Sequence, residues 1–99
     1  MSTRFLVLHW FARSEGDAGP RVGLAVPRKA GGAVKRNRVK RQLREIWSTL
    51  LTSVPPGNDY VLVVRPGLVE AAEARGFGWL GERVTEVLQK AELLERTPA

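Results

Sequence analysis

The sequence predicts an α+β fold in which two amphipathic helices pack on one small β-sheet. Three observations lead to this prediction. Three short runs are rich in β-branched and aromatic residues and are bounded by turn-forming residues, as strands are. Two longer segments repeat apolar residues at helical spacing. The 99 residues suffice for one hydrophobic core, so residues 1–99 are expected to form a single domain.

The strand-like runs lie in two places along the chain. Residues 4–13 (RFLVLHWFAR) are typical of a strand buried on both faces or nearly so. A turn-forming cluster at residues 15–20 and a second short strand at residues 21–26 (RVGLAV) follow, so the two strands are predicted to form an antiparallel hairpin. The almost continuous apolar run at residues 59–65 (DYVLVVR) predicts a third strand in a central position.

Two helices are predicted from apolar residues that fall on one side. The first runs from residue 33 to about residue 54, with Val39, Leu43, Ile46, Trp47, Leu50, Leu51 and Val54 on its apolar side. The second runs from residue 76 to about residue 95, with Phe77, Leu80, Val84, Val87, Leu88 and Ala91 on one face. Residues 70–75 are expected to add a helical turn or two. The predicted order is β-β-α-β-α, a small two-layer sandwich.

Positive charge is concentrated at the start of the first predicted helix. The chain carries a net charge of +6. Eight of its basic residues and no acidic one lie within residues 28–44, whereas the rest of the chain holds eight basic and ten acidic residues. Such a patch favours a polyanionic partner, and nucleic acid is the commonest one. An anionic membrane surface and a merely solvated charged face are the alternatives.

The helical period divides these basic residues by direction. At 100° per residue, Asn37, Arg41 and Arg44 fall on the side opposite the apolar stripe. Arg38 lies on one flank. Arg36 and Lys40 point toward the core side, which would be costly if they were buried. We therefore expect the first turn of the helix to extend beyond the sheet, with both residues in solvent or against a ligand.

Several other classes of function are disfavoured by the composition. The chain has no cysteine, and its one histidine, His9, is too few for the usual zinc sites. No apolar run approaches the length that spans a bilayer, and no signal peptide is recognisable. Gly31-Gly32 does not fit a phosphate-binding P-loop. We expect a cytoplasmic protein without a membrane partner, a small-molecule substrate or an organic cofactor.

The segment PRKAGGAVKRNRVKRQLRE, residues 27–45, resembles the bacterial ribonuclease P protein subunit. In that family a basic pair precedes Gly and Ala-Val, and an Arg-Asn-Arg motif with further basic residues at helical spacing follows. The preceding RVGLAV and the later DYVLVVR are also similar to family members. The resemblance covers roughly residues 3 to 95. It assigns RNA binding to Arg28, Lys29, Lys35, Arg36, Asn37, Arg38, Lys40, Arg41 and Arg44.

The resemblance implies a fold like that of the second domain of ribosomal protein S5, with a left-handed βαβ crossover in place of the usual right-handed one. Family members usually begin with a further helix that walls a cleft beside the sheet, and we expect this first helix to be missing here. In the family, a large RNA cleaves the 5′ leader from precursor tRNA with Mg²⁺, which is bound mainly by that RNA. The protein binds the RNA subunit and the single-stranded leader and supplies no catalytic residue.

Three residues are candidates for the leader surface that the resemblance implies: Phe5, His9 and Arg65. His9 could stack on an unpaired base or be an ordinary strand histidine. Phe5 and Phe11 fit the core better than a stacking platform. Arg65 could contact a phosphate or be a surface charge at a strand end.

Three tryptophans have expected positions in this fold. Trp10 should point away from His9, because neighbouring strand residues face opposite sides. Trp47 lies on the apolar stripe and is expected in the core. Trp79 lies off the stripe of the last helix and could cover a sheet edge.

Two other functions stay open on the sequence. A general nucleic-acid-binding module without a role in processing would show the same basic helix. An autonomous nuclease would need a catalytic set, but Glu45 and Asp59 are isolated and no cluster of His, Cys or carboxylates is evident.

Overall fold

Three strands and three α-helices make up the fold of the computed structural model, which describes residues 1–12, 21–55 and 57–94. The elements are β1 (Leu6–Ala12), β2 (Arg21–Ala25), a 3₁₀-helix η1 (Arg28–Ala30), α1 (Ala33–Leu50), β3 (Asn58–Val64), α2 (Leu68–Arg75) and α3 (Phe77–Lys90). The predicted α+β class and element order are confirmed, with α2 as a helix of eight residues. The predicted turn at residues 15–20 lies outside the described residues.

The sheet has the strand order β1-β3-β2, so the predicted hairpin of the first two strands is wrong. β3 pairs antiparallel with β1 and parallel with β2. The apolar run of β3 predicted a central strand, which is confirmed. Because β3 lies between β1 and β2, these two strands are not hydrogen-bonded to each other, as they would be in a hairpin. The local turn signal was therefore misleading, since it marks a change of direction and not which strands pair.

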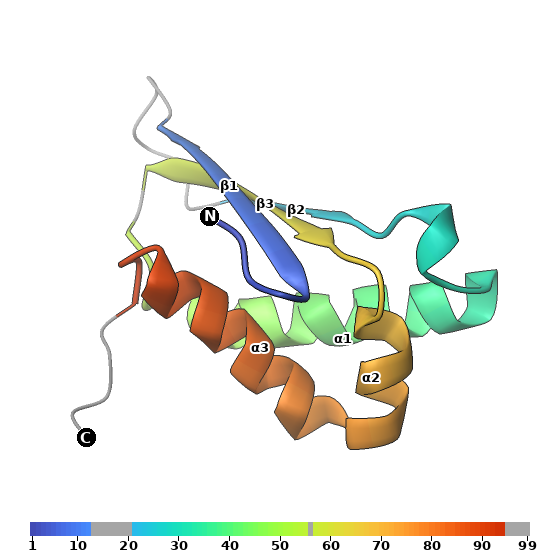
Figure 1. Cartoon of the computed structure of the whole chain (residues 1–99). Coiled ribbons are helices and arrows are strands. Elements are labelled where there is room, and N and C mark those ends of the chain that lie inside the picture. The colour runs from blue at the N-terminus through green and yellow to red at the C-terminus, as the bar shows by residue number, and fades with distance from the viewer. Residues whose placement is uncertain (13–20, 56, 95–99) are drawn as a thin grey trace.

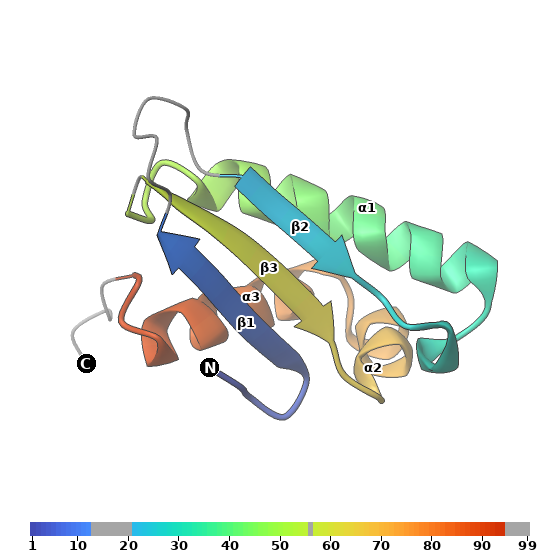
Figure 2. The same ribbon diagram turned by 90° about the horizontal axis from the view of Figure 1, so that it is seen from above.

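All three helices lie on one side of the sheet (Figure 1). Helix α1 connects the parallel strands β2 and β3 by crossing behind the sheet, while α3 lies under β1 (Figure 2). Figure 2 looks onto the sheet with α1 behind it. When the picture is turned so that the arrows of β2 and β3 point upward, β3 lies to the right of β2. With the connecting helix behind the sheet, this is the arrangement of a left-handed βαβ unit. Within the described part of the chain, no helix covers the other face.

The core fills the space between the sheet and the helices. The two strands β1 and β3 contribute alternate residues, Leu6 and Leu8 from β1 and Tyr60, Leu62 and Val64 from β3. Helix α1 buries Val39, Leu43, Ile46 and Trp47, and α3 buries Leu80, Val84, Val87 and Leu88. These residues match the predicted stripes except at one end, because Phe77 is 44% exposed. Trp47 is in the core as predicted, next to Tyr60 at 5.5 Å between ring centres.

Strand β1 is buried on one face, not on both as predicted. Its buried residues are Leu6 and Leu8, whereas the strand from His9 onward is exposed. Trp10 is 37% exposed and Phe11 is 59% exposed, so the expectation that Phe11 belongs to the core is wrong. Phe11 alternates with the buried Leu6 and Leu8, so it lies on the sheet face that no described helix covers and its ring remains in contact with solvent.

Helices α1 and α3 end at earlier residues than predicted. Helix α1 ends at Leu50, and residues 51–53 form a turn. Helix α3 ends at Lys90, where Glu92 has a φ of 60°. The amide of Leu93 donates to the carbonyl of Leu88, and that of Glu92 to the carbonyl of Gln89. These two bonds form a Schellman motif, which terminates the helix. Residue 95, the predicted end, lies outside the described residues.

Candidate nucleic-acid interface

The first half of α1 presents its polar residues as the helical period predicted. Val39 and Leu43 are buried, and Arg36 and Lys40 beside them are half-buried. The exposed polar side chains of α1 up to Arg44 are Lys35, Asn37, Arg38, Arg41 and Arg44, which we call the α1 basic surface. The first turn is not shielded by the sheet, so the basic side chains that lean toward the core side remain partly in solvent. Arg28 and Lys29, also exposed, continue the surface onto η1.

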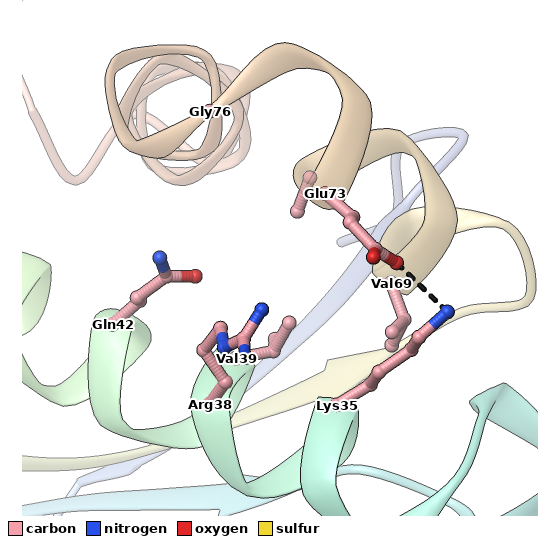
Figure 3. A pocket seen from close by; sticks show the side chains of 8 residues that line it. Lys35, Arg38, Val39, Gln42, Val69, Glu73 and Gly76 are labelled. Atoms are coloured by element: carbon pink, nitrogen blue, oxygen red, sulfur yellow. Dashed lines mark ion pairs between the residues drawn. The ribbon is translucent and has the colours of Figure 1, made fainter.

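The α1 basic surface has one acidic neighbour that the sequence did not reveal. The ammonium of Lys35 lies 3.0 Å from a carboxylate oxygen of Glu73 on α2 (Figure 3). The pair borders a pocket of about 150 Å³ between α1 and α2, which Arg38 and Gln42 also line. Among the described residues, no carboxylate forms an ion pair with the other members of the surface. Four side chains therefore keep their polar groups available to a ligand: Asn37, Arg38, Arg41 and Arg44.

Arg36 has a structural contact in addition to its predicted role. Its Nε donates a hydrogen bond to the carbonyl oxygen of Gly31 at 3.0 Å. Gly31 has a φ of 155°, and a Cβ added there would lie 3.3 Å from Cγ1 of Val69 on α2. Arg36 thus links the first turn of α1 to the loop that passes close to α2. Part of its hydrogen-bonding capacity is used within the protein.

The amino-terminal end of α1 favours an anion. Its N-cap is Gly32, which offers no side-chain cap, and no acidic residue lies in the first turn. The unpaired backbone N–H groups and the helix dipole make this end positive. Basic side chains repel one another there, so this arrangement is unfavourable for an isolated helix. A bound polyanion would remove that cost, and phosphate groups are the ligands such ends prefer.

The uncovered face of the sheet forms a second surface, which we call the open sheet face. Its rows across the strands are Val7–Val63–Ala25, His9–Val61–Gly23 and Phe11–Asp59–Arg21. His9 and Phe11 on β1 and Arg21 on β2 are exposed. His9 lies on the sheet surface, as predicted, and Trp10 has the opposite orientation. An exposed aromatic ring, an imidazole and a guanidinium on one face can stack on bases and contact phosphates.

Phe5 and Arg65 do not join His9 on this surface. The ring of Phe5 packs against Trp79 of α3, with 5.1 Å between ring centres, because the chain bends just before β1 begins. Phe5 is therefore separated from His9, and its role at the leader surface stays a prediction. Arg65 lies beyond the end of β3, four residues from Val61 and thus about 13 Å along the strand. Its Nη1 donates to the carbonyl of Thr3 at 2.8 Å.

Three residue sets near these surfaces were missed by sequence reasoning. Glu73 is paired with Lys35 only through the packing of α2 on α1. Arg21 reaches the open sheet face because β2 pairs with β3. Arg4, Arg75 and Arg83 gather around Phe5 and Trp79, from three separate parts of the chain. No local pattern signals any of these, since each depends on tertiary contacts.

Metal and membrane sites have little support in the described residues. No group of three His, Asp or Glu side chains within residues 1–12, 21–55 and 57–94 could hold a metal ion. No described helix combines the length and the apolar character needed to cross a bilayer.

The comparisons with known proteins show the family of this chain. The family model named Ribonuclease P matches residues 1–92. The chain belongs to the ribonuclease P protein family. It is 36% identical over 87 residues to the ribonuclease P protein component of Brevibacillus brevis, covering 88% of this chain and 66% of that protein. It is 44% identical over 77 residues to the one from Rhodococcus opacus, covering 73% of this chain and 62% of that protein.

Solved structures of the family share the fold. The ribonuclease P protein of Thermotoga maritima superposes with a TM-score of 0.80 at 29% identity, covering 91% of this chain and 80% of that one. A Staphylococcus aureus ribonuclease P protein superposes with a TM-score of 0.79 at 26% identity, covering 95% and 75% of the two chains. The chain spans somewhat less than two thirds of the length of the first curated relatives it matches.

Proposed function

We propose that this chain is the protein subunit of a ribonuclease P that removes the 5′ leader from precursor tRNA in the cytoplasm. The observation that carries the proposal is the α1 basic surface on a chain of this family. It combines exposed Arg and Asn side chains, an uncapped helix start and, among the described residues, one ion-paired carboxylate, Glu73. Catalysis is assigned to the RNA subunit, together with most of the Mg²⁺ binding. The protein contributes positively charged contacts and no reacting group.

In this proposal the two surfaces hold two RNAs. The α1 basic surface binds the RNA subunit, because guanidinium groups make paired hydrogen bonds to phosphates. The open sheet face holds the single-stranded leader, where Phe11 and His9 can stack on unpaired bases. Neither kind of contact depends strongly on sequence: phosphate contacts carry no base information, and stacking tolerates any base. A subunit that serves many precursor tRNAs needs this kind of recognition.

A triple substitution of Asn37→Ala, Arg41→Ala and Arg44→Ala tests the proposal. These side chains are exposed and outside the contact of Arg36 with Gly31, so folding should be preserved. Cleavage of precursor tRNA by the reconstituted holoenzyme at low Mg²⁺ should fall by at least tenfold, if each lost charged contact costs about 1 kcal/mol or more. Lys90→Ala, a charge removed from the far end of α3, is the control and should leave cleavage unchanged.

A general nucleic-acid-binding module is the alternative function. Its expected behaviour differs in two respects: it would bind many RNAs with similar affinity, and it would not stimulate cleavage of precursor tRNA by ribonuclease P RNA. Reconstitution with that RNA separates the two. Cleavage by the protein without any RNA would instead support an autonomous nuclease.

A further inference from the structure

A third arginine-rich site lies on the opposite side of α2 from the α1 basic surface. An open pocket of about 570 Å³ is bordered by the start of β1, the β3–α2 connection, α2 and α3. We call it the arginine–tryptophan pocket and define it by its central side chains: Arg4, Phe5, Arg75, Trp79 and Arg83. As described, none of its lining residues comes from α1.

The side chains of the pocket form a contiguous cluster of two rings and three guanidinium groups. The Cζ of Arg4 lies 5.3 Å from the ring centre of Phe5, which makes an edge contact with Trp79. The Cζ atoms of Arg75 and Arg83 lie 5.9 Å and 5.5 Å from the ring centre of Trp79. A guanidinium held against a ring keeps its N–H edge free for hydrogen bonds and loses little further entropy on binding.

The three guanidinium groups differ in how much of their charge is already compensated. Arg83 lies 3.6 Å from Glu82 and 3.5 Å from Glu86, and its side chain is only 26% exposed. Arg4 and Arg75 are exposed, and within the described residues no carboxylate forms an ion pair with either. The pocket therefore offers two oriented cations beside an aromatic wall, with Glu70 as the one further carboxylate among its lining residues. Two cations and an aromatic wall fit a phosphate together with an unpaired base.

We propose that the arginine–tryptophan pocket binds a single-stranded RNA segment, with Arg4 and Arg75 on its phosphates. The inference rests on the RNA-binding function proposed above and extends it to a surface with no α1 residue. Helix α2 lies between the two sites, because its Glu73 contacts Lys35 of α1 while its Glu70 and Arg75 line this pocket. The segment could belong to the RNA subunit or to the precursor leader, since both present the same sugar–phosphate chemistry.

Two binding measurements on the double variant Arg4→Ala/Arg75→Ala test the proposal and identify the source. The first is the affinity of the protein for ribonuclease P RNA. The second is the affinity of the holoenzyme for precursor tRNA relative to mature tRNA. One of them should weaken about tenfold, as expected for losing about 1.4 kcal/mol of contacts. Weaker binding of ribonuclease P RNA would identify the segment as part of the RNA subunit. Weaker binding of precursor tRNA relative to mature tRNA would identify it as the leader.

The controls separate specific contacts from charge and from folding. Arg4→Lys/Arg75→Lys keeps the charge but not the paired, stacked geometry, and should recover only part of the affinity. If it binds as the unchanged protein does, general charge suffices and the pocket proposal is wrong. The proposal is also overturned if the double Ala variant binds both RNAs within twofold of the unchanged protein, with or without a lower unfolding temperature. The α1 triple variant, measured alongside, reports separately on the proposed function.

Discussion

The ammonium of Lys35 on α1 and the carboxylate of Glu73 on α2 lie 3.0 Å apart at the edge of the α1 basic surface. Both side chains are about half exposed, at 54% and 48%. An exposed pair of this kind contributes little to folding, because solvent screens it. Its greater effect is on the ligand, since Glu73 compensates one positive charge and repels phosphate.

Replacing Glu73 with Gln should therefore strengthen RNA binding while leaving stability almost unchanged. The affinity for ribonuclease P RNA should rise about threefold at moderate salt, and the unfolding free energy should change by less than about 1 kcal/mol. Filter binding and urea unfolding measure the two quantities. Glu92→Gln removes a carboxylate at the far end of α3 and should leave affinity unchanged. Weaker binding by Glu73→Gln would mean that the ion pair positions Lys35 for the RNA.

Salt should weaken RNA binding steeply if the α1 basic surface contacts phosphates. The logarithm of the association constant should fall linearly with the logarithm of salt concentration, with a slope of roughly minus three to minus five for four to six contacts. Removing Arg41 by Arg41→Ala should reduce that slope by about one. A slope near zero would exclude phosphate contacts as the source of affinity.

His9 and Phe11 should matter for the leader and little for folding. Phe11 is 59% exposed and His9 is exposed, so the change His9→Ala/Phe11→Ala removes little core packing. Loss of stacking costs about 1–3 kcal/mol per base, so precursor tRNA should bind the holoenzyme at least fivefold more weakly. Mature tRNA, which has no leader, is the matched control and should bind as before. Equal weakening of both tRNAs would place the effect outside the leader.

Gly31 should be the least replaceable glycine among those described. Its φ of 155° disfavours other residues, and a Cβ there would crowd Val69 at 3.3 Å. Gly31→Ala should cost about 1–3 kcal/mol of unfolding free energy. Gly78→Ala, in α3 with open space around the added Cβ, should instead stabilise the protein by about 0.4–1 kcal/mol. Urea unfolding of both variants checks the prediction, and equal effects would contradict it.

The helices and the α1 basic surface could be predicted from sequence because both depend on local periodicity. The spacing from Val39 to Trp47 fixes which side of α1 is buried, and so places Asn37, Arg41 and Arg44 outward. Strand pairing could not be predicted in the same way. β2 reaches β3 only through the crossover of α1, and short strands carry no signal that names their neighbours.

The contacts that join separate segments were also beyond sequence reasoning. Phe5 and His9 are four residues apart, a spacing that would place them on the same face of an extended strand. The bend before Leu6 instead brings the ring of Phe5 to Trp79 of α3. The apolar character of Phe11 predicts a core position, but burial depends on which sheet face the helices cover. The roles in RNA binding that the resemblance implies stay predictions for these residues, and direct binding is what tests them.

The affinity of the Asn37→Ala/Arg41→Ala/Arg44→Ala variant for ribonuclease P RNA tests the central claim most directly. We expect the dissociation constant to rise by at least tenfold, with the free energy of unfolding within about 1 kcal/mol of the unchanged protein. Lys90→Ala should bind the RNA as the unchanged protein does, although it loses the hydrogen bond from Lys90 Nζ to the carbonyl of Ser2. A folded triple variant that binds the RNA as tightly as the unchanged protein would contradict the assignment of α1 as the RNA-binding surface.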